Sequence, residues 1–203
     1  NQWQRIITVS TLSNSLKGIV SMEVVKTTIE GILLIKPKIY GDSRGYFVET
    51  WQQRRYSNIG INFNFVQDNH SMSYKGTLRG LHYQKKHPQG KLVMVSYGEV
   101  FDVAVDIRPK SPTFGKWYGA FLNENNQHQL WIAPGFAHGF VVLSEMAHFH
   151  YKTTEFYYPG DEHIIQWNDP EIGIDWPQVE PLIISDKDAK APSFRDLIKN
   201  NLL

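Results

Sequence analysis

The feature that most constrains the fold is a succession of short β-rich segments, closely spaced and separated by turn residues. About ten such segments with few helices between them are typical of an antiparallel sandwich or barrel. We expect strands at 32–39, 44–49, 63–66, 77–84, 91–107, 116–122, 129–132, 137–143, 147–154 and 163–167. Short helices are expected at 51–59, ended by Gly60, and at 193–197. The pattern predicts an all-β jelly roll, whose funnel-shaped mouth is suited to a small ligand.

The segment 91–107 has the most regular pattern and is predicted to form a β-hairpin that turns at Gly98. In its second half, Phe101 and Val103 alternate with Asp102 and Ala104. Strict alternation of this kind predicts a half-buried strand with one solvated face.

The chain length of 203 residues suits one domain with a sizeable core. No linker or repeat divides it, so we expect a single jelly-roll domain over 22–203. Regular patterning begins just after Met22, which suggests that residues 1–21 are a non-native or flexible extension. No apolar run approaches the ~20 residues that span a bilayer, and these first residues lack the pattern of a secretory signal.

Composition narrows the classes of partner and chemistry. The net charge of +1 creates no overall field for nucleic acid or an anionic membrane, so neither is expected as a partner. With no cysteine, the chain has no disulfide, thiol nucleophile or thiolate metal ligand. This composition fits a cytoplasmic protein.

Polar side chains concentrate between positions 65 and 91. Arg79 and His82 lie on a semi-apolar strand, where unpartnered polar groups cost free energy. Two interpretations are open: a satisfied core histidine with a surface arginine, or a general base with cations, including Lys91, that hold an anionic ligand. Strict alternation places Arg79 and His82 on opposite faces. Both reach one ligand only if Gly80 marks a bulge.

Four histidines lie on or beside predicted strands: His82, His138, His148 and His150. His148 and His150 share a strand face, which is compatible with a metal site or with two exposed side chains. The strand of His82 carries tyrosine and glutamine where a metal-binding jelly roll has further ligands. We therefore expect no metal.

Two further residues have both a structural and a functional interpretation. Tyr151 lies among apolar neighbours and is either a core tyrosine or a group in the site. Asp188, in the predicted loop around Ser185, is either solvated or folded back against His82, where it would orient the imidazole.

Several ordered motifs resemble one known family. They are GDSRGYFVE, FVQDNHS, GTLRGLHYQ, QGKLV, GEVFDVAVDIR, SPTFGKW, LWIAPGFAHGF, YKTTEFYYPGDE and SDKDA. They occur in the order found in dTDP-4-dehydrorhamnose 3,5-epimerases and cover Met22 to about Phe194. The resemblance implies a cupin-like jelly roll, usually a homodimer, that uses no metal or organic cofactor. The implied reaction inverts C3 and C5 of a dTDP-linked 4-keto-6-deoxyhexose on the route to dTDP-L-rhamnose.

The resemblance also implies roles for individual residues. His82 matches the base, Asp188 its partner, Tyr151 the proton donor and Lys91 the cation near the C4 oxygen. Positions that match substrate contacts are Arg44, Glu49, Gln67, Asn69, Arg79, His138, Tyr157, Glu162 and Lys187. Among these, Arg79 corresponds to the diphosphate ligand and Tyr157 to an aromatic side chain that stacks on thymine.

Other functions remain open at the level of sequence. A related enzyme that inverts only one of the two carbons shares the base and the tyrosine. A metal-dependent cupin oxygenase or isomerase and a non-catalytic sugar-binding jelly roll share the fold. Neither of the last two explains why His82, Lys91, Tyr151 and Asp188 occur together.

Overall fold

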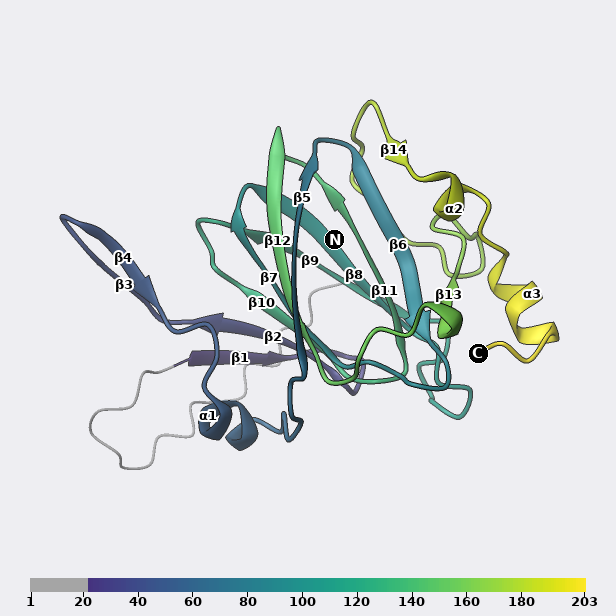
Figure 1. Cartoon of the computed structure of the whole chain (residues 1–203), viewed down its shortest axis with the longest axis horizontal. Coiled ribbons are helices and arrows are strands. Elements are labelled where there is room, and N and C mark those ends of the chain that lie inside the picture. The colour runs from purple at the N-terminus through teal and green to yellow at the C-terminus, as the bar shows by residue number, and fades with distance from the viewer. Residues whose placement is uncertain (1–21) are drawn as a thin grey trace.

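The computed structural model describes residues 22–203, so the expectation for 1–21 lies outside the described residues. Two antiparallel sheets face each other (Figure 1). The first has the strand order β1 (Met22–Lys26), β2 (Ile32–Pro37), β10 (Gln129–Ile132), β7 (Lys91–Tyr97), β12 (Met146–Thr153) and β5 (Gln67–Tyr74). The second has the order β13 (Glu162–Ile164), β6 (Thr77–Gln84), β11 (Phe136–Val142), β8 (Glu99–Asp106) and β9 (Trp117–Asn123). The predicted all-β jelly roll is confirmed.

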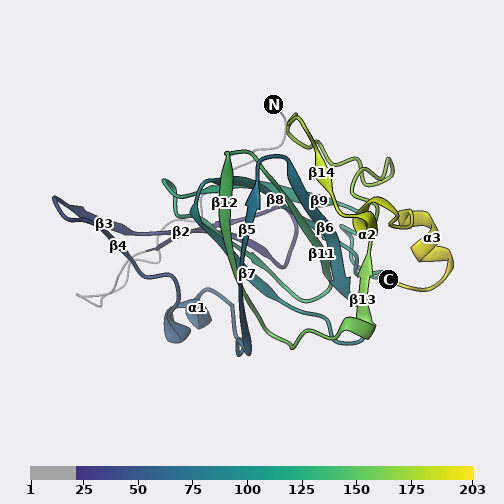
Figure 2. The ribbon, with the colours of Figure 1, turned by 45° about the horizontal axis from the view of Figure 1, so that its top comes forward.

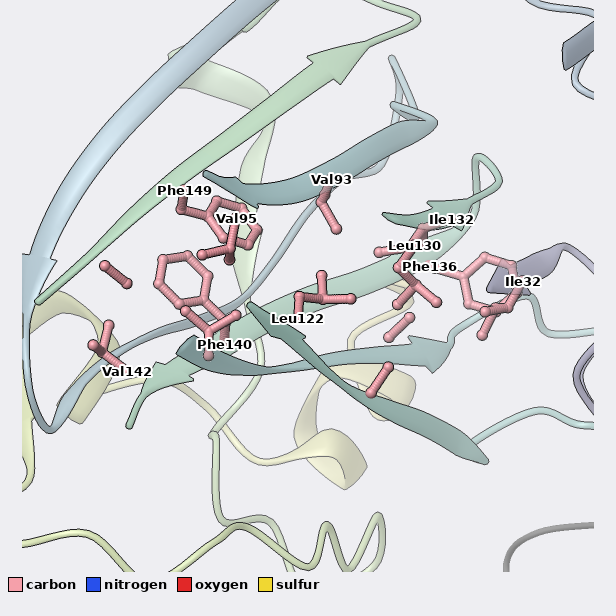
Figure 3. Close-up of a cluster of buried hydrophobic side chains, with 14 of the residues drawn as sticks. Ile32, Val93, Val95, Leu122, Leu130, Ile132, Phe136, Phe140, Val142 and Phe149 are labelled. Atoms are coloured by element: carbon pink, nitrogen blue, oxygen red, sulfur yellow. The ribbon is translucent and has the colours of Figure 1, made fainter. Parts of the chain in front are cut away.

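Apolar side chains fill the space between the two sheets. Figure 3 shows this core, in which Val93 and Phe149 from the first sheet meet Leu122 and Phe140 from the second. The rings of Phe140 and Phe149 stack with centroids 4.2 Å apart. Burial of this surface holds the sheets together and fixes which strand faces point inward.

Each sheet is also covered on its outer face. The second sheet carries β14 (Ile183–Ile184), α2 (Asp186–Ala189) and α3 (Phe194–Lys199), which run along its outer side in both views (Figures 1 and 2). This segment helps to bury Leu81 and Val103. A helix, α1 (Gln53–Asn58), covers part of the first sheet and buries Tyr56 against Trp131. No helix between residues 22 and 203 is long and apolar enough to cross a membrane.

The predicted hairpin over 91–107 is wrong. Both strands exist, but β7 pairs with β10 and β12, whereas β8 pairs with β9 and β11. The turn at Gly98 therefore connects the two sheets instead of closing a hairpin. Gly98 has φ +78°, and a Cβ at this position would lie 2.0 Å from the carbonyl oxygen of Met146.

The prediction that β8 is half-buried is also wrong. Every residue from Val100 to Asp106 is buried. Phe101 and Val103 pack beneath the C-terminal segment, while Val100 and Ala104 belong to the core between the sheets. Alternation of aspartate with apolar residues suggested a solvated face, but Asp102 and Asp106 have partners inside the protein.

The strands β1, β5 and β14 were not predicted, and most other boundaries differ in small ways. The strand predicted at 63–66 is wrong, because these residues form no strand and lie just before β5. Residues 185–188, expected in a loop, include the start of α2, which Ser185 caps. A two-stranded arm, formed by β3 (Ile39–Asp42) and β4 (Gly45–Val48), projects from the sandwich on the side away from β6 and α2 (Figures 1 and 2). A short 3-10 turn, η1 (Pro159–Asp161), precedes β13.

Candidate active site

A bulge at Gly80 brings Arg79 and His82 onto the same face of β6. On β11, His138 pairs with His82 and Phe140 pairs with Arg79. The segment from Arg79 to His82 on β6 is therefore one residue longer than the segment of β11 that it pairs with. Leu78, Leu81 and Tyr83 point to the outer core. Arg79 and His82 consequently point to the inner side, as the bulge predicted from sequence requires.

His82 and Asp188 form a dyad. His82 Nε2 lies 2.7 Å from Asp188 Oδ1, and the backbone N–H of Gly80 donates to Asp188 Oδ2 over 3.2 Å. Burial acts to raise the pKa of Asp188, but these hydrogen bonds and the His82 charge outweigh it and hold the pKa below its usual range. The ionised carboxylate therefore accepts a hydrogen bond from the N–H at Nε2 of His82. The lone pair of the neutral imidazole is then on Nδ1.

Lys91 and Tyr151 come from the opposite sheet. Lys91 is on the same face of β7 as the core residue Val93, which pairs with Tyr151 on β12. Burial lowers the pKa of Lys91 to about 8, against the opposing charges of Asp102 and Glu162. Burial raises the pKa of the Tyr151 hydroxyl, which stays protonated at neutral pH.

A polar cluster lies beside this pair. The Tyr157 hydroxyl donates to Glu162 Oε2 over 3.2 Å, and the Lys187 ammonium bonds to the same carboxylate. Gln67 accepts from the backbone N–H of Tyr157 at 3.0 Å and donates to Asn69 at 3.0 Å. These five residues, all expected to be substrate contacts, are joined in one hydrogen-bonded group.

Arg79 and His138 lie close to the dyad. Arg79 Nε donates to Ser73 Oγ at 3.1 Å, and its positive charge acts on Tyr151. His138 is directly opposite His82 on the neighbouring strand and is almost fully buried. Both positions are therefore next to the groups expected to perform the chemistry.

Asp102 is a further polar residue of the interior that the sequence pattern did not reveal. Its Oδ2 accepts from His138 Nε2 over 2.8 Å inside the sandwich. The alternation of polar and apolar residues on β8 predicted that Asp102 faces solvent, so the residue was not considered as part of the interior. A buried carboxylate is recognisable only once its partner is known.

Two expected substrate contacts are not brought to the dyad within one chain. Arg44 is on the projecting arm, where its only side-chain partner among the described residues is Asp42. Glu49 follows the arm and pairs with Arg55 of α1 at 2.9 Å. The arm formed by β3 and β4 projects on the side of the molecule away from β6 (Figure 2).

His148 and His150 lie on the outer face of β12, as their spacing predicts. His148 Nδ1 is 3.0 Å from His70 Nε2, and His150 stacks on His70 with centroids 4.3 Å apart. The prediction that these histidines share a face is confirmed. This face is opposite to that of Tyr151 on the same strand.

Comparison with known proteins decides the family. The model of the dTDP-4-dehydrorhamnose 3,5-epimerase family matches residues 26–196. A dTDP-4-dehydrorhamnose 3,5-epimerase of Escherichia coli K12 is 50% identical over 184 residues, which cover 90% of this chain and 100% of that protein. The chain belongs to the dTDP-4-dehydrorhamnose 3,5-epimerase family. It is an enzyme of the isomerase class.

Solved structures of family members have the same fold. The dTDP-6-deoxy-D-glucose-3,5-epimerase of Legionella pneumophila, in complex with dTDP-4-keto-L-rhamnose, superimposes with a TM-score of 0.87 and 54% identity, covering 90% of this chain and 97% of that one. A 3'-monoepimerase of Streptomyces bikiniensis, in complex with dTDP-quinovose, has a TM-score of 0.82 and 31% identity, covering 87% and 90%. The fold is thus common to epimerases that act on one carbon and on two.

Proposed function

We propose that this epimerase inverts C3 and C5 of dTDP-4-dehydro-6-deoxy-D-glucose to give dTDP-4-dehydro-L-rhamnose. The observation that carries the proposal is the placement of the His82–Asp188 dyad on one sheet and of Lys91 and Tyr151 on the facing sheet. A sugar bound between the sheets has a base on one side and an acid on the other. That arrangement suits inversion of a carbon next to a ketone.

The residues act in a defined order. His82 Nδ1 removes the proton from the carbon next to the C4 ketone, and the electron pair moves onto the C4 oxygen. The Lys91 ammonium stabilises the enolate that forms. Tyr151 returns a proton to the opposite face of the carbon, which inverts it. The imidazolium then releases its extra proton to solvent, the Tyr151 phenolate takes one up, and the cycle repeats at the second carbon.

Asp188 keeps His82 ready for this role. Its carboxylate accepts from Nε2 and stabilises the positive charge that the imidazole gains when it takes a proton. Contacts remote from the reacting carbons hold the sugar in place: Arg79 binds the diphosphate, and Tyr157 stacks on thymine. Remote binding energy of this kind positions the reacting carbon between base and acid.

The placement of Arg44 and Glu49 supports a homodimer as the functional unit. The arm exposes Tyr46 and Phe47, with 56% and 65% of their surfaces accessible, and extends away from its own dyad. Exposed aromatic side chains on a projecting segment are favourable for contact with another chain. Arg44 therefore serves the nucleotide bound to the second chain of the dimer.

The decisive experiment is incubation with dTDP-4-dehydro-6-deoxy-D-glucose in heavy water, read by NMR. Deuterium at both C3 and C5, with an L-rhamno product, is expected. Exchange at only one carbon favours a single-carbon epimerase, the second candidate, whose fold this chain also matches. Binding of the substrate without any exchange would refute the catalytic role.

A further inference from the structure

Asp102 is a buried charge that the reaction scheme above does not use. It lies on β8 with 0% of its surface accessible and shares the inner face of that strand with Val100 and Ala104, while Lys91 shares the inner face of β7, in the facing sheet, with Val93. One oxygen, Oδ2, accepts from His138, whereas Oδ1 is the one buried side-chain oxygen or nitrogen of residues 22–203 without a hydrogen-bond partner. An unsatisfied buried acceptor lowers the stability of the folded state. Such a cost calls for a functional explanation.

The bonded oxygen determines the form of His138. A carboxylate only accepts, so His138 Nε2 carries the hydrogen and Nδ1 keeps its lone pair. Burial lowers the pKa of His138, and the Lys91 charge acts in the same direction. His138 is therefore neutral at neutral pH and leaves the negative charge of Asp102 uncancelled.

That negative charge acts on Lys91. The residues that pair with Lys91 on the adjacent strands, Thr153 and Ile132, are uncharged. The charges that raise its pKa are Asp102 on β8 and Glu162 on β13, with Asp102 the stronger. His138 on β11 opposes them when it is protonated.

Neither acid is tied to Lys91 by an ion pair. Glu162 bonds to Lys187 and Asp102 bonds to His138. An ammonium locked onto a carboxylate has fewer N–H donors for a ligand oxygen. A carboxylate that interacts with Lys91 only through its charge favours the protonated ammonium and leaves the three N–H donors of Lys91 free to bind a ligand oxygen.

We propose that Asp102 is a positioning residue that keeps the Lys91 ammonium protonated inside the sandwich without binding it, and holds His138 as the Nε2–H tautomer. The proposal rests on the role assigned to Lys91 above. It explains why Asp102 remains in the interior although its Oδ1 has no hydrogen-bond partner: the negative charge of the carboxylate stabilises the protonated form of Lys91. It also gives the buried strand β8 a part in catalysis.

The test is Asp102→Asn, which removes the charge and keeps the shape. We expect the pKa of Lys91, followed by NMR of ¹³C-labelled lysine and assigned with Lys91→Arg, to fall by about one to two pH units. The alkaline limb of the kcat profile should move to lower pH by the same amount. The NMR titration needs no substrate, so it distinguishes failure of this inference from failure of the proposed function.

Asp106→Asn is the matched control. Asp106 is four positions along the same strand, equally buried, and bonded to Arg108 at 2.7 Å. This variant should lose stability but leave the Lys91 titration unchanged. An unchanged Lys91 pKa in Asp102→Asn, or an equal shift in the control, would overturn the proposal.

A second variant covers failure of Asp102→Asn to fold. Asp102→Glu keeps the charge and should keep the alkaline limb of kcat within a few tenths of a pH unit of the wild-type position. A shift of a full unit or more in that variant would contradict a role based on charge. ¹⁵N NMR of His138 adds a separate check, since a protonated Nδ1 with a bare Nε2 would refute the assigned tautomer.

Discussion

His82 Nε2 lies 2.7 Å from Asp188 Oδ1, although 106 residues separate the two in the sequence. The contact forms because β14 pairs in parallel with β6 at Thr77 and Leu78, which places α2 beside the bulge at Gly80. Ser185 caps α2 by accepting from the N–H of Asp188 at 3.1 Å. The C-terminal segment is thus part of the candidate active site as well as a cover for the outer core.

The first prediction concerns the base. His82→Ala should abolish deuterium incorporation from heavy water at both C3 and C5, because we propose that one imidazole serves both carbons. A general base contributes about 100- to 10,000-fold. His163→Ala is the control, since His163 is on β13 beside Tyr83 and outside the dyad. Exchange at a normal rate in His82→Ala would remove this residue from its role.

Tyr151→Phe separates proton removal from proton return. The variant keeps the ring that packs against the core but lacks the hydroxyl that we propose as the proton donor. We expect exchange at C3 or C5 to continue while epimerisation falls by about 100-fold or more. NMR of the recovered sugar measures both. Full epimerisation by this variant would show that another group is the acid.

The dependence of kcat on pH should reveal the titration of the Lys91 ammonium. Its pKa is lowered to about 8, so the ammonium is present below that pH and is lost as the pH rises through it. We expect kcat to fall about tenfold per pH unit above this point. Tyr151 does not set this limb, because burial raises its pKa. In Lys91→Arg the guanidinium stays charged, and any residual activity should persist to higher pH.

Gly80→Ala tests the bulge. Gly80 has φ +125°, and a Cβ there would lie 2.6 Å from the Cα of Gly139 and 2.7 Å from the carbonyl oxygen of His138. Backbone strain and overpacking should lower the free energy of unfolding by about 2–4 kcal/mol, measured by denaturant titration. Gly160→Ala is the control, because a Cβ there meets nothing within 4 Å. Equal stability of both variants would mean that β6 tolerates a side chain at the bulge.

Hybrid dimers test the arm. Arg44→Ala and His82→Ala chains are each expected to be poorly active alone. If Arg44 serves the site of the other chain, each hybrid dimer contains one intact site. Unfolding and refolding the two together in equal amounts should then restore about one quarter of wild-type activity. No recovery, with hybrid dimers present by mass spectrometry, would place Arg44 in its own chain's site.

Much of the fold was predictable from local pattern. The strand at Thr77–Gln84 and the helix after Ser193 were found because side-chain alternation and capping residues are properties of a few neighbouring positions. The hairpin at Gly98 was not, since a glycine turn has the same local pattern whether it joins partners in one sheet or crosses to another. Pairing is decided by which surfaces bury together.

The sequence by itself determined most of the strands, the need for a bulge at Gly80 and, through its motifs, the family. Only the tertiary structure decided that Asp102 is buried beside His138, that Lys91 lies in the facing sheet, and that the arm carrying Arg44 projects away from β6. Alternation along a strand tells which residues share a face. It does not tell whether that face meets water or another sheet, because burial depends on segments distant in the chain.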